Sequence, residues 1–588
     1  MAAKRLDGGW TLCCGVWPSF LMPSLTDVEG ALREQGILKK EPAGLDALYD
    51  RWVDAQSWIY SLEFDCPGED ERASLRFEML SGVGAVRLNG RAVAEFDSGE
   101  FAVDVTKDVR PEGNRLEVTF TPGARGRGIL GPVWLRTTNY VELKRVRATA
   151  SQGVLKVSSD LNAHTAGRFL FKYQVSLDGE MVTTSEIYER LRASDAHLEH
   201  EVKLPTPIKW DGERYYTVRL MVERSGVGCD SVMLNAAMDA PEPRRVAGIP
   251  GARNRDLIRA LKNLGAEAVC AAIAGAENAL TPFDLLPDGL LLTGAPGEPD
   301  ECEDGDLLAL PEPRALEKLA GGEKYWPPGA PVWRATGSPC PDIEAAEALY
   351  GPNALGDAAR YARLSRFQQA EAIRALALNA RRSGEAFAVR AAEGEPKLSS
   401  IALIEYSGKP RPAYGALKGA WGGCAAFEFP EPFAAHPPLR VWLHPAGVGR
   451  NPVTVTASAY RLDGALIASI SFTAMPGAQS APLGELRATL PEEGVVIART
   501  EVSDGGKVSR IDQVICLSKP DSPPRGALLN PPRAELKMSG GELICAGNAA
   551  ALGVFAGGFY GCLLPGEKIP LAGGIAPEDI ESLNGQIL

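Results

Sequence analysis

Hydrophobic and polar residues alternate along much of the first quarter of the chain. Between Trp58 and Asn139, six short segments place apolar residues at every second position, and Gly, Pro, Asp and Asn separate them. A period of two is typical of strands with one buried face. The segments are WIYSLEF, ASLRFEML, AVRLNG, FAVDVT, RLEVTF and PVWLRTT. The spacing predicts a β-sandwich over residues 1–140.

The same alternation continues over residues 141–246 and predicts a second small sandwich. After residue 247 the period changes, because DLIRALKNLGAEAVCAAIAG indicates a helix followed by a buried strand. Residues 354–383 predict one long helix, and the Pro- and Gly-rich stretch 294–341 predicts a long connection. Alternation returns after Gly422, with a division near Pro520–Pro524, and predicts two further sandwiches.

The length, net charge and cysteine content of the chain limit the classes of protein to which it can belong. The chain has 588 residues, which favours several domains. The 62 Lys and Arg against 75 Asp and Glu give a net charge of −13, which argues against a nucleic-acid-binding protein, because such a protein needs a basic surface. No apolar run is long enough to span a membrane. The 11 cysteines include no C-x-x-C pair, so we expect no disulfide framework, no zinc site and a reducing, cytoplasmic compartment.

Several motifs resemble the β-mannosidase type of glycoside hydrolase family 2. The first strands (Trp52, Trp58, Tyr60), the segment Tyr406–Trp421 and the segment Phe559–Lys568 are similar to that family's opening jelly-roll, barrel exit and last module. The resemblance implies a mainly β, multidomain fold with an α/β part. The implied domains are a galactose-binding-like jelly-roll (1–140), an immunoglobulin-like sandwich (141–246), a shortened, degenerate TIM-like barrel (247–422), an immunoglobulin-like sandwich (423–518) and a C-terminal immunoglobulin-like module (519–588).

The resemblance also implies which catalytic groups should be present. A retaining glycosidase needs two carboxyl groups on one barrel face, one as acid and one as nucleophile. The family places its nucleophilic Glu two residues before a Gly, and the matching segment VWRATG puts Ala335 before Gly337. Residues 247–422 contain no Asn-Glu acid/base motif, and they are fewer than a full barrel requires. We therefore expect no catalytic residue.

Other polar and aromatic residues are candidates for a remaining site. The acidic residues near the expected strand ends are Asp284, Asp288, Glu393, Glu395 and Glu405. We expect them to be solvated loop charges, although two of them could form a relocated acid–base pair. Trp326 and Trp333 could stack on a sugar or anchor a small core, and Arg390 stands where the family has a Trp-bearing strand. These three residues are the predicted substrate-binding groups.

Metal and anion sites are not expected elsewhere. His197 and His200 are three positions apart on a predicted strand and face opposite sides, so they cannot share a metal. Arg125 and Arg127 lie in a glycine-rich turn, which predicts a solvated loop, with contact to an anionic ligand as the alternative.

The favoured hypothesis is a β-mannosidase-like protein that has lost catalysis and binds carbohydrate or serves as a scaffold, with no cofactor. The alternatives are an active exo-acting retaining β-glycosidase with relocated carboxylates, and a structural subunit. An incomplete barrel leaves strand edges that must be covered, so we expect a homo-oligomer or a complex with a related catalytic protein.

Overall fold

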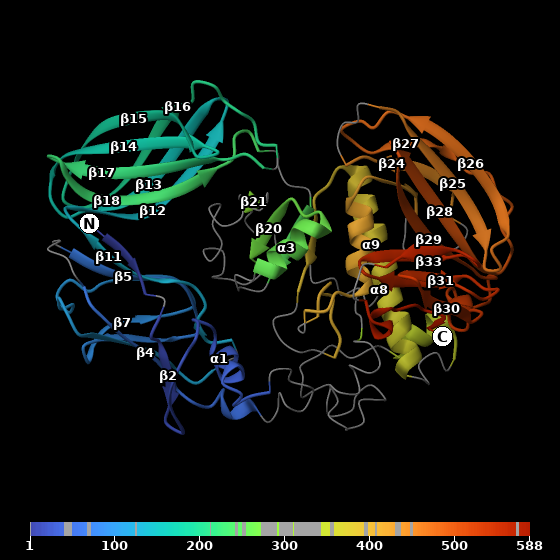
Figure 1. Cartoon of the computed structure of the whole chain (residues 1–588), viewed down its shortest axis with the longest axis horizontal. Helices are drawn as coiled ribbons and strands as arrows, with labels where there is room; N and C mark the ends of the chain where they lie inside the picture. Colours follow the sequence, from blue (N-terminus) through green and yellow to red (C-terminus); the bar gives the residue numbers. More distant parts are fainter. Residues whose placement is uncertain are drawn as a thin grey trace.

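The chain folds into several β-sandwiches around a smaller α/β part, as the computed structural model shows (Figure 1). The structure describes residues 2–6, 8–39, 50–66, 72–123, 126–211, 213–240, 245–249, 255–271, 291–292, 310, 343–352, 358–392, 398–405, 408–429, 437–446, 451–571 and 575–587. The mainly β, multidomain fold expected from the sequence is confirmed.

The first module is a sandwich of two sheets with a short helix, α1 (Val28–Glu34). Its six-stranded sheet has the order β3-β2-β4-β9-β6-β7, and its other sheet contains β1, β11, β5, β10 and β8. Trp10, Trp58 and Phe77 are buried between the sheets. The strands are β1 (Ala2–Arg5), β2 (Thr11–Cys14), β3 (Trp17–Leu21), β4 (Trp58–Phe64), β5 (Arg72–Ser81), β6 (Gly84–Leu88), β7 (Arg91–Phe96), β8 (Gly99–Asp104), β9 (Asn114–Phe120), β10 (Gly128–Ile129) and β11 (Val133–Thr138).

The second module is also a sandwich, with sheets β12-β13-β16 and β15-β14-β17-β18. A buried ion pair joins it to the first module, because Arg136 Nη2 of β11 lies 2.6 Å from an Asp230 carboxylate oxygen of β18. The strands are β12 (Val141–Ser151), β13 (Val154–Ala163), β14 (Gly167–Leu177), β15 (Glu180–Leu191), β16 (Asp195–Lys203), β17 (Tyr216–Arg224) and β18 (Val227–Ala236).

The α/β part contains a parallel sheet with the order β21-β20-β19-β22. Its strands are β19 (Arg245–Ile249), β20 (Ala268–Ala271), β21 (Leu291–Leu292) and β22 (Phe387–Arg390). The last of these strands in the chain pairs with the first, which is the pairing that closes a (β/α) barrel. The described residues include four such strands, and the predicted shortened barrel stays a prediction because most of residues 272–342 lie outside them.

Two helices of the α/β part, α8 (Ala358–Ser383) and α9 (Pro412–Trp421), pack against the C-terminal sheets. The other described helices of this part are α3 (Arg255–Leu264) and α7 (Ile343–Tyr350). The middle of α8 is buried on all sides, and α8 and α9 lie beside the last two groups of sheets in Figure 1. Ile511, Phe555 and Tyr560 from those sheets belong to the same core as Ile373 of α8. The predicted long helix is therefore the central packing element of this half.

The remaining strands form four sheets. The first two have the orders β23-β24-β27 and β26-β25-β28-β29, and the last two have the orders β34-β31-β30-β35 and β32-β33. The strands are β23 (Cys424–Phe427), β24 (Arg440–His444), β25 (Val453–Arg461), β26 (Leu466–Ala474), β27 (Ala481–Glu485), β28 (Gly494–Asp504), β29 (Lys507–Leu517), β30 (Ala534–Ser539), β31 (Glu542–Cys545), β32 (Ala551–Ala556), β33 (Phe559–Leu563), β34 (Lys568–Pro570) and β35 (Gly585–Ile587).

Candidate functional site

The carboxyl edge of the parallel sheet is where a barrel enzyme would carry its site. Arg390 is the last residue of β22, it pairs in register with Gly248 of β19, and its side chain is exposed. Its guanidinium makes no ion pair with any other described residue. Trp326, Trp333 and Ala335 lie outside the described residues, so the structure places one of the three predicted substrate-binding groups.

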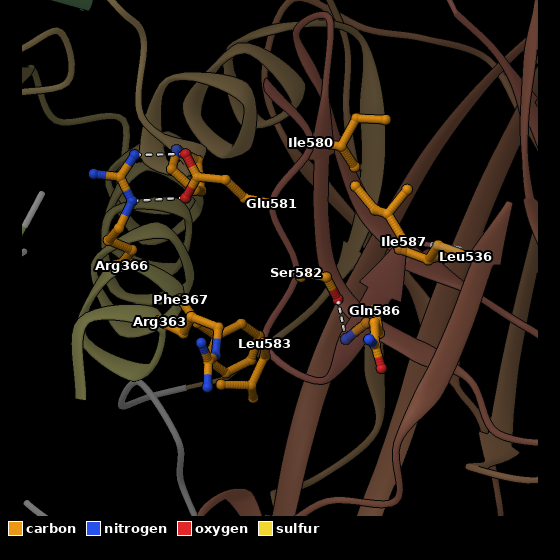
Figure 2. Close-up of a pocket in the computed structure, with 13 residues that line it drawn as sticks. Arg363, Arg366, Phe367, Leu536, Ile580, Glu581, Ser582, Leu583, Gln586 and Ile587 are labelled. Carbon is orange, nitrogen blue, oxygen red and sulfur yellow. Dashed lines mark hydrogen bonds and ion pairs between the residues drawn. The ribbon is translucent and has the colours of Figure 1, made fainter. Parts of the chain in front are cut away.

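A pocket of about 280 Å³ opens between α8 and the last module (Figure 2). Arg363, Arg366 and Phe367 of α8 line one side. The opposite side comes from Leu536 of β30 and from the chain end. The other lining residues are Pro412, Gly553, Ile580, Glu581, Ser582, Leu583, Gly585, Gln586 and Ile587. No residue of the parallel sheet lines this pocket, so it is separate from the carboxyl edge of that sheet.

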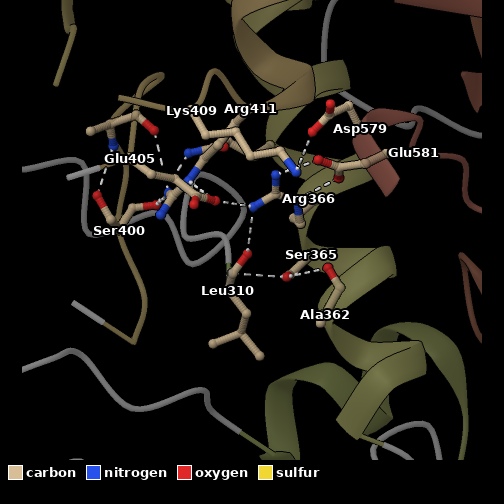
Figure 3. Close-up of polar contacts among 12 residues, drawn as sticks. Leu310, Ala362, Ser365, Arg366, Ser400, Glu405, Lys409, Arg411, Asp579 and Glu581 are labelled. Carbon is tan, nitrogen blue, oxygen red and sulfur yellow. Dashed lines mark hydrogen bonds and ion pairs between the residues drawn. The ribbon is translucent and has the colours of Figure 1, made fainter. Parts of the chain in front are cut away.

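Arg366 forms ion pairs with two segments, the C-terminal segment of the pocket wall and the segment that follows β22. Its side chain is 2% exposed, and its Nε and Nη2 donate to the two carboxylate oxygens of Glu581 at 2.7 and 2.6 Å (Figure 2). Its Nη1 donates to Glu405 Oε1 at 2.7 Å and to the Leu310 carbonyl at 3.2 Å (Figure 3). One guanidinium therefore neutralises carboxylates from two segments that are distant in sequence.

Glu405 is held by a second arginine as well. Arg411 Nε lies 3.5 Å from Glu405 Oε1, and Arg411 Nη1 donates to the Ser400 carbonyl at 2.8 Å. Burial alone would raise the pKa of Glu405, but the guanidinium groups of Arg366 and Arg411 outweigh it and lower the pKa. The carboxylate is therefore ionised near neutral pH, which suits an ion pair and not a general acid.

The expectation that Glu405 is a solvated loop charge is wrong. Its side chain is 13% exposed and is paired, because the turn at Lys409 brings Arg411 back onto it. Asp284, Asp288, Glu393 and Glu395 lie outside the described residues, so a relocated pair among them stays untested.

The expectation for Arg127 is also wrong. Its side chain is 2% exposed, and it donates to the carbonyls of Val53, Gln56 and Thr121. Three backbone carbonyls at the end of the first sandwich need hydrogen-bond donors, and the guanidinium of Arg127 supplies them. Arg125, the other arginine of that turn, lies outside the described residues.

The two histidines of β16 face opposite sides, as predicted. His197 is exposed and lies 2.6 Å from Asp160, whereas His200 is buried and contacts the Tyr173 hydroxyl. No group of three His, Cys, Asp or Glu side chains suited to a metal occurs among the residues that the structure describes. The cysteines whose side chains are described, eight in number, are free thiols.

Sequence reasoning missed the pairing of Arg366 with Glu581. The two residues are 215 positions apart, and neither stands in a motif. The only hint in the sequence is that the long helix carries several arginines. Taken alone, these arginines predict a solvent-exposed helix face, because the sequence does not show the sheets that cover them.

The first module is similar in sequence to known proteins. Residues 17–127 match the family model described as the glycosyl hydrolase 2 galactose-binding domain-like domain. A curated β-mannosidase B of Aspergillus clavatus is 32% identical over 108 residues, and one of Neosartorya fischeri is 33% identical over 108 residues. The matched region is 18% of this chain and 12% of the length of those relatives.

Solved structures resemble the whole chain. A β-D-mannosidase from Dictyoglomus thermophilum superimposes with a TM-score of 0.72 at 14% identity, covering 100% of both chains. The exo-chitosanase CsxA of Amycolatopsis orientalis has a TM-score of 0.66 at 13% identity, covering 100% of this chain and 99% of that chain.

The chain thus shares the fold of these two solved structures, with sandwiches before and after an α/β part. Its first module is similar in sequence to the galactose-binding-like domain of glycosyl hydrolase family 2 and to the matching part of the two curated β-mannosidases. Among the described residues, no helix is both long and apolar enough to cross a membrane.

Proposed function

We propose that the chain is a β-mannosidase-related protein that binds carbohydrate or serves as a scaffold without hydrolysing glycosidic bonds. The observation that carries the proposal is the pairing of Glu405, which follows β22 in the chain, with two arginines. A paired carboxylate with a lowered pKa stays ionised near neutral pH and therefore cannot donate a proton to a leaving group. The sequence adds Ala335 at the position that matches the family's nucleophile.

The test is hydrolysis of p-nitrophenyl β-mannoside, β-glucoside and β-galactoside by the purified chain. We expect rates no higher than those of a buffer blank. Loss of measurable turnover in Glu393→Gln or Asp284→Asn, with Glu112→Gln in the first module as the unaffected control, would instead establish an active enzyme with relocated carboxylates.

Arg390 is the proposed carbohydrate contact at the carboxyl edge, with Trp326 and Trp333 as proposed stacking groups. An exposed guanidinium at the end of a rigid strand can donate to sugar hydroxyls, which supports the assignment. Stacking on one aromatic ring adds only about 0.5–1.5 kcal/mol beyond burial, so we expect millimolar affinity at best for mannose.

The partner proposed for this chain is a second copy or a related catalytic protein. The shortened barrel predicted from the sequence would leave strand edges, and such edges favour pairing with another chain. Light scattering at micromolar concentration tests the first option, and a monomer would contradict it. The proposed compartment is the cytoplasm, because the described cysteines are free thiols.

A further inference from the structure

The pocket between α8 and the chain end has the features of a binding site that the proposed function does not use. Its volume of about 280 Å³ is at the lower limit of small-molecule sites. Most of its lining comes from the buried helix α8 and from the segment that runs into strand β35, and α9, β30 and β32 contribute one residue each. Both walls are thus parts of packed elements, which favours a preformed site over a transient gap.

The lining of the pocket includes buried apolar residues on both sides. Phe367 on the α8 side is 3% exposed, and Ile580 and Leu536 are buried on the opposite side. Gly553 has a φ of 57°, and a Cβ there would lie 2.5 Å from Phe367 Cδ2. The lack of a side chain at this position therefore leaves the space that the Phe367 ring occupies. An apolar group of a ligand would meet a rigid surface here.

The free charge of the pocket is positive. Glu581 is neutralised by Arg366, and Arg366 is fully engaged by Glu581 and Glu405. Arg363 lies one turn earlier on α8, is exposed and makes no ion pair with any other described residue. In Figure 2 its guanidinium lies beside Leu583 at the edge of the apolar lining. The exposed Gln586 amide adds a neutral donor on the other wall.

We infer that this pocket binds a small organic monocarboxylate, with the carboxylate on Arg363 and the apolar body against Phe367. A guanidinium presents paired N–H donors that match a carboxylate, and an apolar lining rejects a strongly hydrated inorganic anion. The small volume limits the ligand to about the size of one ring. This site is independent of the proposed carbohydrate contact at Arg390, since the two share no residue.

The test is a ligand-observed NMR titration of the full chain with benzoate, and with benzyl alcohol as the neutral analogue. We expect saturable benzoate binding in the millimolar range, weaker by about fivefold or more for benzyl alcohol, because the charge-assisted hydrogen bonds are lost. Arg363→Gln should weaken benzoate binding by a similar factor. Arg487→Gln, which changes an exposed arginine outside the pocket, should leave it unchanged.

Three outcomes would overturn the inference. The first is absence of saturation by benzoate, and the second is equal binding of benzoate and benzyl alcohol. The third is displacement of benzoate by methyl β-mannoside, which would make the pocket a sugar site. Arg363 is exposed, so its replacement should not disturb folding, and Gln586→Leu provides a second variant that should weaken binding about twofold through loss of one neutral hydrogen bond.

Discussion

Glu29 is a buried carboxyl group whose charge is poorly compensated. It is 4% exposed, its Oε1 has no hydrogen-bond partner, and its Oε2 accepts from Gly126 N at 3.3 Å. Burial and the nearby Asp27 carboxylate raise the pKa of Glu29 to about 7. The folded state therefore keeps a proton that the unfolded chain has already lost between about pH 4.5 and pH 7.

The first prediction follows from the sign of this shift. The free energy of unfolding of the first module should fall as the pH rises from about 4.5 to about 7. Glu29→Gln should abolish this fall. At pH 8 we expect the variant to be more stable than the parent by up to about 3 kcal/mol, and at pH 5 to be nearly equal. Urea unfolding followed by tryptophan fluorescence measures this difference. Glu34→Gln, at the exposed end of the same helix, is the control, and a gain that is equal at both pH values would contradict the prediction.

Arg366 is the opposite case, a buried charge that is fully compensated. Arg366→Met would leave Glu405 and Glu581 without their shared cation, and breaking such a buried pair costs about 3–5 kcal/mol. Arg363→Met, one turn away and exposed, should change stability by less than about 0.5 kcal/mol. Chemical denaturation of the full chain distinguishes the two. If Arg366→Met lowered the free energy of unfolding no more than the surface substitution Arg363→Met, the ion-pair network would not stabilise the protein.

At the scale of elements, a side chain of helix α8 binds the C-terminal end of helix α9. Arg381 of α8 donates to the carbonyls of Ala420, Gly422 and Pro445, and the last two distances are 2.6 and 2.7 Å. These include carbonyls that a helix end leaves without a partner inside the helix. One side chain thus fixes α9 and the loop after β24 to α8.

The prediction at this scale is that Arg381→Met loosens the end of α9. Losing hydrogen bonds from a charged donor costs about 2–3 kcal/mol, and backbone amide exchange in α9 should speed up accordingly. Arg382→Met is the matched control, because its guanidinium lies 3.8 Å from Glu428 and 5.7 Å from the centre of the Trp442 ring and so contacts strand β24 and the segment after β23. Equal exchange rates in the two variants would contradict the assignment of Arg381.

Many of the strands could be predicted from the sequence, whereas the buried charges could not. WIYSLEF alternates because β4 has neighbours on both sides and one buried face, and it was found with its observed bounds. The edge strand β15 lies within residues 141–246, for which the alternation predicts a sandwich, although most of its residues are exposed or half-buried. Glu405 was read as solvated because its partners come from residues 366 and 411, which no local period connects.

At the scale of the whole molecule, the hydrophobic cores divide the chain into two halves. The two cores of the first sandwiches contain no residue beyond Met238. The core around α8 combines residues from Ala247 to Tyr560. The α/β part therefore shares its interior with the C-terminal sheets, and the first two sandwiches have their own.

The corresponding prediction concerns fragments. A fragment of residues 1–240 should fold alone and melt cooperatively in circular dichroism, because it contains both of its cores. A fragment of residues 245–423 should not, because it lacks Ile511, Phe555 and Tyr560. A folded second fragment would show that the α/β part is an autonomous domain.

The long separation between Arg366 and Glu581 also has a consequence for how the protein is made. The contact spans 215 residues, and ribosomes add about 5–20 residues per second, so α8 waits roughly 10–40 s for its partner. During that time the helix exposes apolar and charged surfaces that are both buried in the finished protein. The first two sandwiches can complete their cores while synthesis continues. We therefore expect nascent chains halted between residues 383 and 581 to be the forms that chaperones bind most strongly.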